Sequence, residues 1–199
     1  MPLYLVRHAE TDWNLEPARC QGWAEVELNE TGRAQARERG RALRGSGVEL
    51  VVTSHLLRAR ETASLMHEEL GGDLPLVVDP RLAESHRGDW ETRTFAELMA
   101  EEPEAWRAYL ERPGEFRFPG GESLVEQQRR VLACLRDCAA DGRTMLLVTH
   151  GGSIRLTRCF LEGRSIGAFH DSRTVNGGVD VVETKDLAAR IAAHLSAAV

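Results

Sequence analysis

Two histidines and two arginines of this 199-residue chain stand where folding could bring them to one place. Arg7 and His8 directly follow a short apolar run, and His150 comes just after another. Arg58 comes shortly after a third run, in the first turn of a helical pattern, where a cation opposes the helix macrodipole unless an anion is bound. Cationic and imidazole side chains beside free backbone amides are typical of a phosphate-binding site.

The elements that must position these side chains alternate along the chain. Short apolar runs indicate strands, and patterns with helical periodicity lie between them. Strands are expected at residues 3–6, 50–52, 76–78, 145–148 and 179–182, and helices at about 31–44, 56–70, 94–111, 123–139, 153–162 and 186–197. The runs are apolar at odd and even positions, which predicts strands buried on both faces.

This alternation predicts the fold class α/β, a three-layer α/β/α sandwich around a mostly parallel central sheet. Capping boxes at Thr94 and Ser123 mark two helix starts, and Pro103 is expected to divide the 94–111 stretch into two helices. Open α/β sheets bind ligands beyond the carboxyl ends of their strands. His8 and His150 are therefore expected to meet at that edge.

Length and composition fit one globular domain spanning residues 1–199. The 25 basic and 31 acidic residues give a formal net charge of −6, which argues against nucleic acid and anionic membranes as partners. No apolar stretch approaches the roughly 18 residues that a membrane-spanning helix needs, and the N-terminal run is too short for a signal peptide. A cytoplasmic protein with reduced cysteines is expected.

Each candidate residue also has a purely structural explanation. A histidine after an apolar strand is often a hydrogen-bonded core residue, and an arginine in a first helical turn often forms a surface ion pair. Independent structural roles would scatter these residues along the chain, however. Their coincidence at the carboxyl ends of predicted strands favours a convergent site, although spacing alone does not name the reaction.

The segment 5–11, LVRHAET, resembles the signature of the histidine phosphatase superfamily in its phosphoglycerate-mutase-like branch. Further segments resemble the family's later motifs in the same order, at residues 21–22, 28–36, 54–63, 82–91, 119–123, 148–155 and 176–178. Together they extend from residue 3 to about residue 184. An Arg-His dipeptide alone would be weak evidence, but the ordered set is specific.

The resemblance implies a phosphohistidine mechanism. His8 would be the nucleophile that attacks phosphorus, and its attack requires a neutral imidazole. Arg7, Arg58 and His150 would hold the phosphoryl oxygens and neutralise the moving charge. Glu84 would protonate the leaving oxygen and then activate water, helped by a pKa that a bound phosphate raises.

The resemblance also implies supporting ligands and no cofactor. Asn14 and Gln21, with Gly22 and Gly151 through backbone amides, would be secondary phosphate ligands. The cationic side chains would take the place of a metal, and the sequence shows no carboxylate cluster for Mg²⁺. The expected partner is a phosphorylated small molecule.

Both phosphatases and cofactor-dependent phosphoglycerate mutases belong to this family. The insertion between Glu84 and His150 is expected to form a small helical lid at about residues 92–122. It lacks the longer, basic, proline-rich segment with which the mutases retain a bisphosphate, which favours hydrolysis of a phosphomonoester. One alternative is a mutase, because His86 is similar to a residue that the mutases carry at this position. The other is a protein that binds a phosphorylated ligand without turnover.

Several residues depart from the family pattern. Thr92 replaces a common Gly, so the local turn is expected to differ, and His55 replaces a common Asp. Arg87 stands where many phosphatases carry an apolar residue. It would either pair with a substrate carboxylate or lie on the surface beside Asp89.

Two further features concern the lid and the C-terminus. The lid aromatics at 106, 109, 116 and 118 are expected to form a small core, with a wall for an apolar leaving group as the alternative. Leu187, Ile191 and Leu195 give the last helix an apolar face. That face is expected to pack on the domain itself; packing on a second copy would make a homodimer rather than a monomer.

Overall fold

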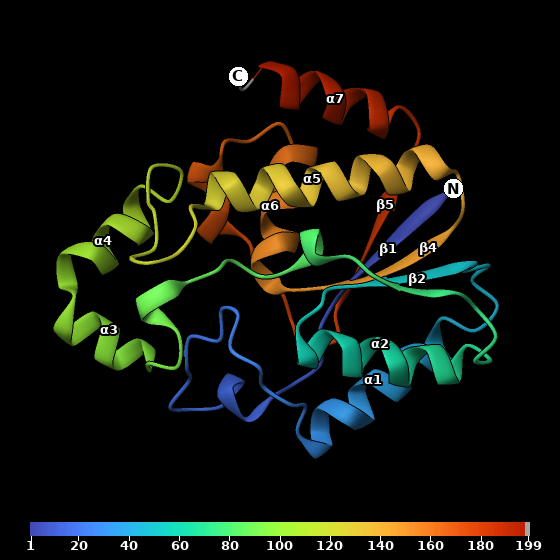
Figure 1. The fold of residues 1–199 in the computed structure, drawn as a ribbon, viewed down its shortest axis with the longest axis horizontal. Coiled ribbons are helices and arrows are strands. Elements are labelled where there is room, and N and C mark those ends of the chain that lie inside the picture. Colours follow the sequence, from blue (N-terminus) through green and yellow to red (C-terminus); the bar gives the residue numbers. More distant parts are fainter. Residues whose placement is uncertain (198–199) are drawn as a thin grey trace.

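A five-stranded sheet lies between two layers of helices in the computed structural model, which describes residues 1–197 (Figure 1). The strands are β1 (Pro2–Arg7), β2 (Leu50–Thr53), β3 (Leu76–Val78), β4 (Met145–Thr149) and β5 (Val179–Glu183), in the spatial order β3-β2-β4-β1-β5. All neighbours are parallel except β1 and β5, which are antiparallel. The predicted α/β sandwich with a mostly parallel sheet is confirmed.

The helices alternate with the strands as the sequence pattern predicts. They are α1 (Glu30–Ala42), α2 (Leu57–Glu69), α3 (Phe95–Glu101), α4 (Pro103–Glu111), α5 (Leu124–Asp141), α6 (Gly151–Leu161) and α7 (Leu187–Ala197). Short 3-10 turns lie at Asp12–Asn14, Pro80–Leu82, Gly88–Trp90 and Ile166–Asp171. The break between α3 and α4 falls at Pro103, and both predicted capping boxes form, at Thr94 and Ser123.

Two hydrophobic cores fill the spaces on either side of the sheet. Because successive side chains of a strand point to opposite faces, Leu3 and Leu5 of β1 pack towards α5, α6 and α7, whereas Val6 packs towards α1 and α2. Leu187 and Ile191 of α7 are buried in the first of these cores, and Leu195 packs against it. The last helix therefore packs on its own chain, as predicted.

The two outer strands are more exposed than the sequence pattern suggests. Residues 76–78 of β3 are all exposed, with Val77 at 49%, and Val182 is the one fully buried residue of β5 among those described. The prediction that all five strands are buried on both faces is wrong for these two. β3 and β5 lie at the ends of the strand order, so each has a neighbouring strand on one side only.

Helices α1 and α2 are joined by ion pairs along their exposed sides. Arg33 pairs with Glu61 at 2.6 Å, Arg37 with Glu68 at 2.9 Å, and Arg41 with Glu69 at 3.1 Å. Arg44 also pairs with Glu69, at 2.7 Å. These charges lie at the surface, where each pair contributes at most about 1 kcal/mol to stability.

Helices α3 and α4 form a lobe beyond one end of the sheet (Figure 1). Its interior is an aromatic cluster in which Trp90, Tyr109, Phe118 and Phe169 are buried, with Trp106 and Phe116 packed against them. The ring centroids of Trp90 and Phe118 are 5.4 Å apart. The prediction that the lid aromatics form a small core is confirmed.

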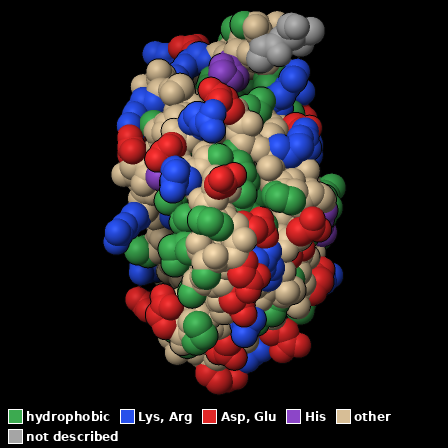
Figure 2. All heavy atoms as spheres, turned by 90° about the vertical axis from the view of Figure 1, so that its left-hand side faces the viewer, with side chains coloured by type: hydrophobic (Ala, Val, Ile, Leu, Met, Phe, Trp, Pro, Cys, Tyr) green, Lys and Arg blue, Asp and Glu red, His purple; other side chains and the backbone are tan. Residues whose placement is uncertain are grey.

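Figure 2 views the molecule from the side that carries this lobe. Acidic side chains gather over its lower part, and hydrophobic side chains lie between the charged ones. Met99 of α3 and Leu110 of α4 are the exposed large hydrophobic residues of these two helices.

The backbone at Thr92 adopts the left-handed conformation, with φ at 72°. Its N–H donates to the Cys20 carbonyl, and its own carbonyl accepts from Arg19. Thr92 thus adopts the left-handed conformation that favours Gly, the residue common at this position in the family. A β-branched residue in this conformation is strained.

Within residues 1–197, no helix is both long and apolar enough to cross a membrane.

Candidate active site

A pocket of about 660 Å³ opens at the carboxyl ends of β1 and β4. His8 follows β1 and His150 follows β4, and these strands are neighbours with Arg7 opposite Thr149. Ser54 follows β2, on the other side of β4. The order of the parallel strands therefore brings together residues that are more than 90 positions apart in the chain.

His8 presents one ring nitrogen to this pocket. Its Nδ1 lies 2.8 Å from the carbonyl oxygen of Ala9, and since a carbonyl can only accept, Nδ1 carries the proton. Nε2 is left with its lone pair available to a ligand. Burial and the charges of Arg58, His150 and Arg7 lower the pKa of His8 well below 6.5, against the hydrogen bond to Ala9, so the imidazole is neutral at pH 7.

The backbone around His8 is fixed by side chains from two other elements. Thr62 of α2 accepts from the Ala9 N–H at 3.0 Å and donates to the Arg58 carbonyl at 2.7 Å. Asn176, in the turn before β5, donates to the carbonyls of His8 and Ala9 and to the Asn14 side chain. Both residues lie in segments that resemble family motifs, but nothing in the sequence gives them this positioning role.

Arg7 and Arg58 are held by backbone carbonyls rather than by carboxylates. Arg7 donates to Thr174 at 2.9 Å, and Arg58 donates to Gly22 at 2.7 Å and to Ala24 at 3.0 Å. The Nε atoms of both arginines are buried and have no hydrogen-bond partner among the described residues. Burial lowers the pKa of Arg58 to about 10, which still leaves it charged at pH 7.

His150 lies behind His8 and is fully buried. The two ring centroids are 5.3 Å apart, and Nε2 of His150 lies 2.9 Å from the hydroxyl of Ser54. Its Nδ1 is buried and unpartnered among residues 1–197. Burial, followed by the charge of Arg58, lowers the pKa of His150 well below 6.5, so this ring is also neutral at pH 7.

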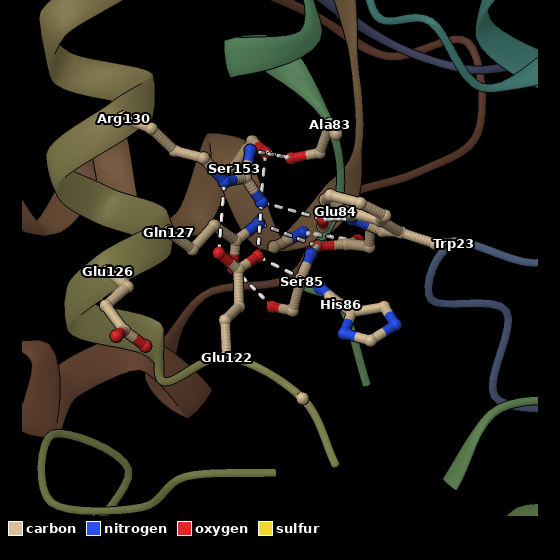
Figure 3. Close-up of polar contacts among 12 residues, drawn as sticks. Trp23, Ala83, Glu84, Ser85, His86, Glu122, Glu126, Gln127, Arg130 and Ser153 are labelled. Carbon is tan, nitrogen blue, oxygen red and sulfur yellow. Dashed lines mark hydrogen bonds and ion pairs between the residues drawn. The ribbon is translucent and has the colours of Figure 1, made fainter. Parts of the chain in front are cut away.

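Glu84 enters the pocket from the segment after β3, and both of its carboxylate oxygens accept hydrogen bonds (Figure 3). Oε1 accepts from the side chain of Gln127 at 2.9 Å and from the N–H of Ser85 at 3.0 Å. Oε2 accepts from the N–H of Gly152 at 3.0 Å. Gln127 also donates to Ser153 at 3.1 Å and accepts a short hydrogen bond from the Ser85 hydroxyl.

Hydrogen bonds also hold the backbone of Glu84 in place. Arg130 of α5 donates to the carbonyls of Ala83 and Glu84, both at 2.7 Å, and Trp23 donates to the same Glu84 carbonyl at 2.7 Å (Figure 3). Arg130 itself pairs with Glu122. The carboxylate is therefore positioned by α5, by α6 and by the loop that carries Trp23.

These contacts set the ionisation of Glu84 in the unliganded pocket. Burial acts to raise its pKa, but the charge of Arg87 and the hydrogen bonds from Gly152, Gln127 and Ser85 outweigh it and lower the pKa to about 2. The carboxylate is ionised at pH 7. A bound phosphate is expected to raise the pKa of Glu84, and it must do so against the effect of these contacts.

Helix α6 starts two residues earlier than predicted, with Gly151 and Gly152 in its first turn. A Cβ atom at Gly152 would lie 2.2 Å from Oε1 of Glu84, so glycine is required for the close approach of the carboxylate. Gly151 lines the pocket. The N–H of the next residue, Gly152, donates to Glu84.

The structure brings the remaining predicted phosphate ligands to the same pocket. Asn14, Gln21 and Gly22 all line it. Asn14 accepts from the N–H and hydroxyl of Thr11, and the side-chain amide of Gln21 donates to that hydroxyl at 2.9 Å. Gly22 has φ at 47°, and its carbonyl accepts a hydrogen bond from Arg58.

Arg87 also lines the pocket, and it does not pair with Asp89 on the surface. Its guanidinium carbon lies 5.0 Å from the ring centroid of Phe118 and 5.8 Å from that of Tyr109. Of the two predicted positions, the structure supports the one inside the pocket. Trp106 and Tyr109 line the same cavity, so the lid core also supplies one of its walls.

Sequence reasoning missed Gln127 and Arg155. Gln127 lies on the buried side of α5 with no local signal of its own, and its contact with Glu84 depends on how α5 packs. Arg155 lies on α6, in the second turn of the helix that follows His150, and lines the pocket. The spacing from His150 could have indicated it.

The pocket places a neutral imidazole, two arginines and a carboxylate around one cavity, a set of groups suited to binding a phosphoryl group. His8 offers a nucleophilic nitrogen, Arg7 and Arg58 offer unneutralised positive charge, and Glu84 stands where a leaving oxygen can reach it. Among residues 1–197, no three His, Cys, Asp or Glu side chains are grouped to hold a metal ion.

Comparison with known proteins identifies a family that this chain matches and proteins that are similar to it in sequence. Residues 3–195 match the family described as histidine phosphatase superfamily (branch 1). A probable phosphoglycerate mutase (GpmB) of Enterobacter sp. strain 638 is 38% identical over 154 residues, which are 76% of this chain and 70% of that protein.

Solved structures with the same fold are also similar in sequence. YhfR of Bacillus stearothermophilus superposes with a TM-score of 0.86 at 31% identity, covering 92% of this chain and 90% of that one. A mycobacterial glucosyl-3-phosphoglycerate phosphatase, solved in complex with VO3, gives a TM-score of 0.82 at 31% identity, covering 92% and 90%.

Proposed function

We propose that this chain, which belongs to the histidine phosphatase superfamily (branch 1), hydrolyses phosphomonoesters of small metabolites through a phosphohistidine at His8. The superfamily acts on phosphorylated small molecules. The observation that carries the proposal is the state of His8. Its Nδ1 is fixed by the Ala9 carbonyl, its Nε2 is available, and its ring is neutral beside two charged arginines.

The first step forms the bond between Nε2 of His8 and phosphorus and breaks the bond between phosphorus and the ester oxygen. Arg7 and Arg58 supply the positive charge that phosphoryl transfer requires and are held in place before substrate arrives. The ring of His150 lies beside that of His8, tilted by 52°, and we assign it to the same phosphoryl site. In the second step water attacks phosphorus and His8 leaves.

Glu84 handles the proton in both steps. Because its carboxylate is ionised in the empty pocket, we assign the proton that the leaving oxygen takes to the substrate. A phosphomonoester is a mixture of mono- and dianion near pH 6, and the monoanion carries that proton. Glu84 receives it, passes it to the leaving oxygen, and then accepts a proton from the attacking water.

A phosphoglycerate mutase is the second candidate, and it is favoured by the relative described as a probable phosphoglycerate mutase. The two activities share the first step and differ in what accepts the phosphoryl group. The short lid, α3 and α4 with the loop to residue 122, supports water as the acceptor. The phosphatase among the structural neighbours supports the same choice.

Phosphate release from a panel of phosphomonoesters in EDTA tests the proposal. We expect release without a metal ion, and no formation of 2-phosphoglycerate from 3-phosphoglycerate. Isomerisation that depends on 2,3-bisphosphoglycerate would make the chain a mutase. Tight binding of phosphorylated ligands with no turnover of any of them would make it a binding protein.

A further inference from the structure

The pocket holds more positive charge than one phosphoryl group uses. Among the described residues that line it, one is acidic, Glu84, and six are arginines: Arg7, Arg19, Arg58, Arg87, Arg155 and Arg173. Within residues 1–197, no carboxylate lies within 4.0 Å of the side-chain nitrogens of any of these six. The proposed hydrolysis uses Arg7 and Arg58, so the charge at the lid end of the pocket is unexplained.

Arg87 is fixed at that end by aromatic rings. Its guanidinium carbon lies 5.0 Å from the centroid of Phe118 and 5.8 Å from that of Tyr109, both in the lid core. Contacts of this kind hold the planar group in one orientation without using its N–H donors. Burial acts to lower its pKa, but Tyr109, Cys20 and Glu84 outweigh it and the pKa is raised, so Arg87 is charged.

Arg155 reaches the same pocket from a different element, helix α6. Its guanidinium carbon lies 5.4 Å from the centroid of Phe169, and its Nε is buried with no hydrogen-bond partner among the described residues. Arg155 lines the same pocket as Arg7, and its charge contributes, after burial, to lowering the pKa of Arg7.

His170 connects the two arginines. It lines the pocket, and its Nε2 lies 3.0 Å from the Tyr109 carbonyl. Burial lowers its pKa, and both Arg155 and Arg87 lower it further, so the two guanidinium groups act on the same ring. Two half-buried cations that line one pocket beside a neutral imidazole, with no carboxylate partner among the described residues, favour an anion that enters between them.

We propose that Arg87 and Arg155 form a second anion-binding subsite, and that the substrate is a phosphomonoester whose leaving group carries another anionic group. A carboxylate or a second phosphate has the oxygen geometry that a guanidinium binds with two parallel hydrogen bonds. As a statement about substrate this rests on the proposed function, but the subsite itself can be tested by binding alone.

Calorimetric binding to the His8→Ala protein separates the subsite from turnover. The matched probes are 3-phosphoglycerate and glycerol 3-phosphate, which share a three-carbon skeleton and differ in a carboxylate. We expect 3-phosphoglycerate to bind about 30-fold more tightly, the effect of charge-assisted hydrogen bonds. Propane-1,3-diol bisphosphate, tested in parallel, shows whether the subsite prefers a carboxylate or a phosphate.

Substitution of the two arginines tests their assignment. Arg87→Met and Arg155→Met, each in the His8→Ala background, are expected to reduce the affinity ratio about tenfold. Arg107→Met is the matched control, because Arg107 is an exposed arginine of α4 that does not line the pocket, and it should leave the ratio unchanged.

The outcomes distinguish the two proposals. Equal affinity for 3-phosphoglycerate and glycerol 3-phosphate overturns the subsite, even if the wild-type chain hydrolyses both. A ratio that survives both substitutions also overturns it, and would leave the two arginines with a packing role against the aromatic rings. Failure of the wild-type chain to release phosphate from any probe overturns the proposed function, while the binding ratio still decides the subsite.

Discussion

Arginine side chains occupy two kinds of surroundings in this molecule. On α1, Arg33, Arg37 and Arg41 each pair with a glutamate of α2 at the surface, at distances of 2.6 to 3.1 Å. In the pocket, Arg7 and Arg58 donate to backbone carbonyls and meet no carboxylate within 4.0 Å among the described residues. Arginines are therefore paired with carboxylates in one region and have no carboxylate partner in the other.

The difference separates charge that supports the fold from charge held ready for a ligand. An exposed ion pair contributes little because water already solvates both groups. A buried cation without a counter-ion destabilises the empty protein, and that cost is recovered when an anion binds. Substitutions on α1 should therefore leave activity intact, whereas substitutions in the pocket should remove activity and leave the fold at least as stable.

Arg58→Met, with Arg41→Met as its control, tests the difference between these two kinds of arginine and has the largest expected effect. Loss of a charged phosphate ligand should lower kcat/KM by about 10²- to 10³-fold. The free energy of unfolding should rise by about 1 kcal/mol, because Met removes a buried charge although it leaves two carbonyls without a donor. Phosphate release and urea unfolding measure the two effects.

The Arg41→Met control should keep full activity and change stability by less than about 0.5 kcal/mol. If Arg58→Met lost several kcal/mol of stability while the purified protein kept its activity, the pocket arginine would be structural and the comparison would fail.

The pH dependence of kcat/KM tests the charge state of the catalytic groups. Glu84, with a pKa near 2, is ionised above about pH 3, so the reaction needs the monoanion of an alkyl phosphate. We expect kcat/KM to fall about tenfold per pH unit above roughly pH 6.5. His8 stays neutral well below pH 6.5, so no loss of activity should appear as the pH falls through that value.

An aryl phosphate with a good leaving group is the control, because its oxygen needs no proton. Its profile above pH 6.5 should be flatter than that of an alkyl phosphate. A decline in kcat/KM as pH falls below 6.5 would show that His8 titrates normally, contrary to its burial among cations.

Gln127→Leu tests how the carboxylate of Glu84 is positioned in the pocket. The change removes a donor 2.9 Å from Glu84 and the partner of the Ser85 hydroxyl. We expect kcat for alkyl phosphates to fall about tenfold and kcat for activated aryl phosphates to fall less, because a displaced Glu84 transfers its proton poorly. Ser85→Ala keeps the bond from Gln127 to Glu84 and should have the smaller effect.

Parallel slowing of alkyl and aryl substrates by Gln127→Leu would point to a general disturbance of the pocket. In that case Gln127 would have no specific role in positioning Glu84.

Thr92→Gly should give the smallest effect and one confined to stability. Glycine relieves the left-handed conformation at φ 72° but adds freedom to the unfolded chain, for a net gain of about 0.5–1 kcal/mol. Thr31→Gly on α1, where the backbone is helical, should lose about 0.3–0.5 kcal/mol instead. Thermal unfolding compares the two, and a loss of stability in Thr92→Gly would show that the threonine side chain is needed in the turn.

The sequence predicted the phosphoryl end of the pocket better than the lid end. His8 and His150 could be placed together because the carboxyl ends of neighbouring parallel strands must meet. Arg58 could be placed because it stands at the start of the helix after β2. These positions follow from local patterns and from the rules of α/β sheets.

The partners of Glu84 could not be predicted in the same way. Gln127 reaches the carboxylate only because one side of α5 packs beside α6, and no local pattern distinguishes it from its neighbour Gln128. Likewise, the apolar run 76–78 predicted a buried strand, but its exposure is set by its place at the edge of the sheet. Contacts between distant elements decide both cases.

Trapping the phosphoenzyme tests the central claim most directly. The chain is mixed with an activated aryl phosphate, quenched within milliseconds under alkaline conditions, and digested for mass spectrometry. We expect one phosphoryl group per chain on His8, and none in the His8→Ala protein, which should also lose phosphate release by several orders of magnitude. Phosphate release at a normal rate from His8→Ala, or a phosphoryl group on another residue, would contradict the account.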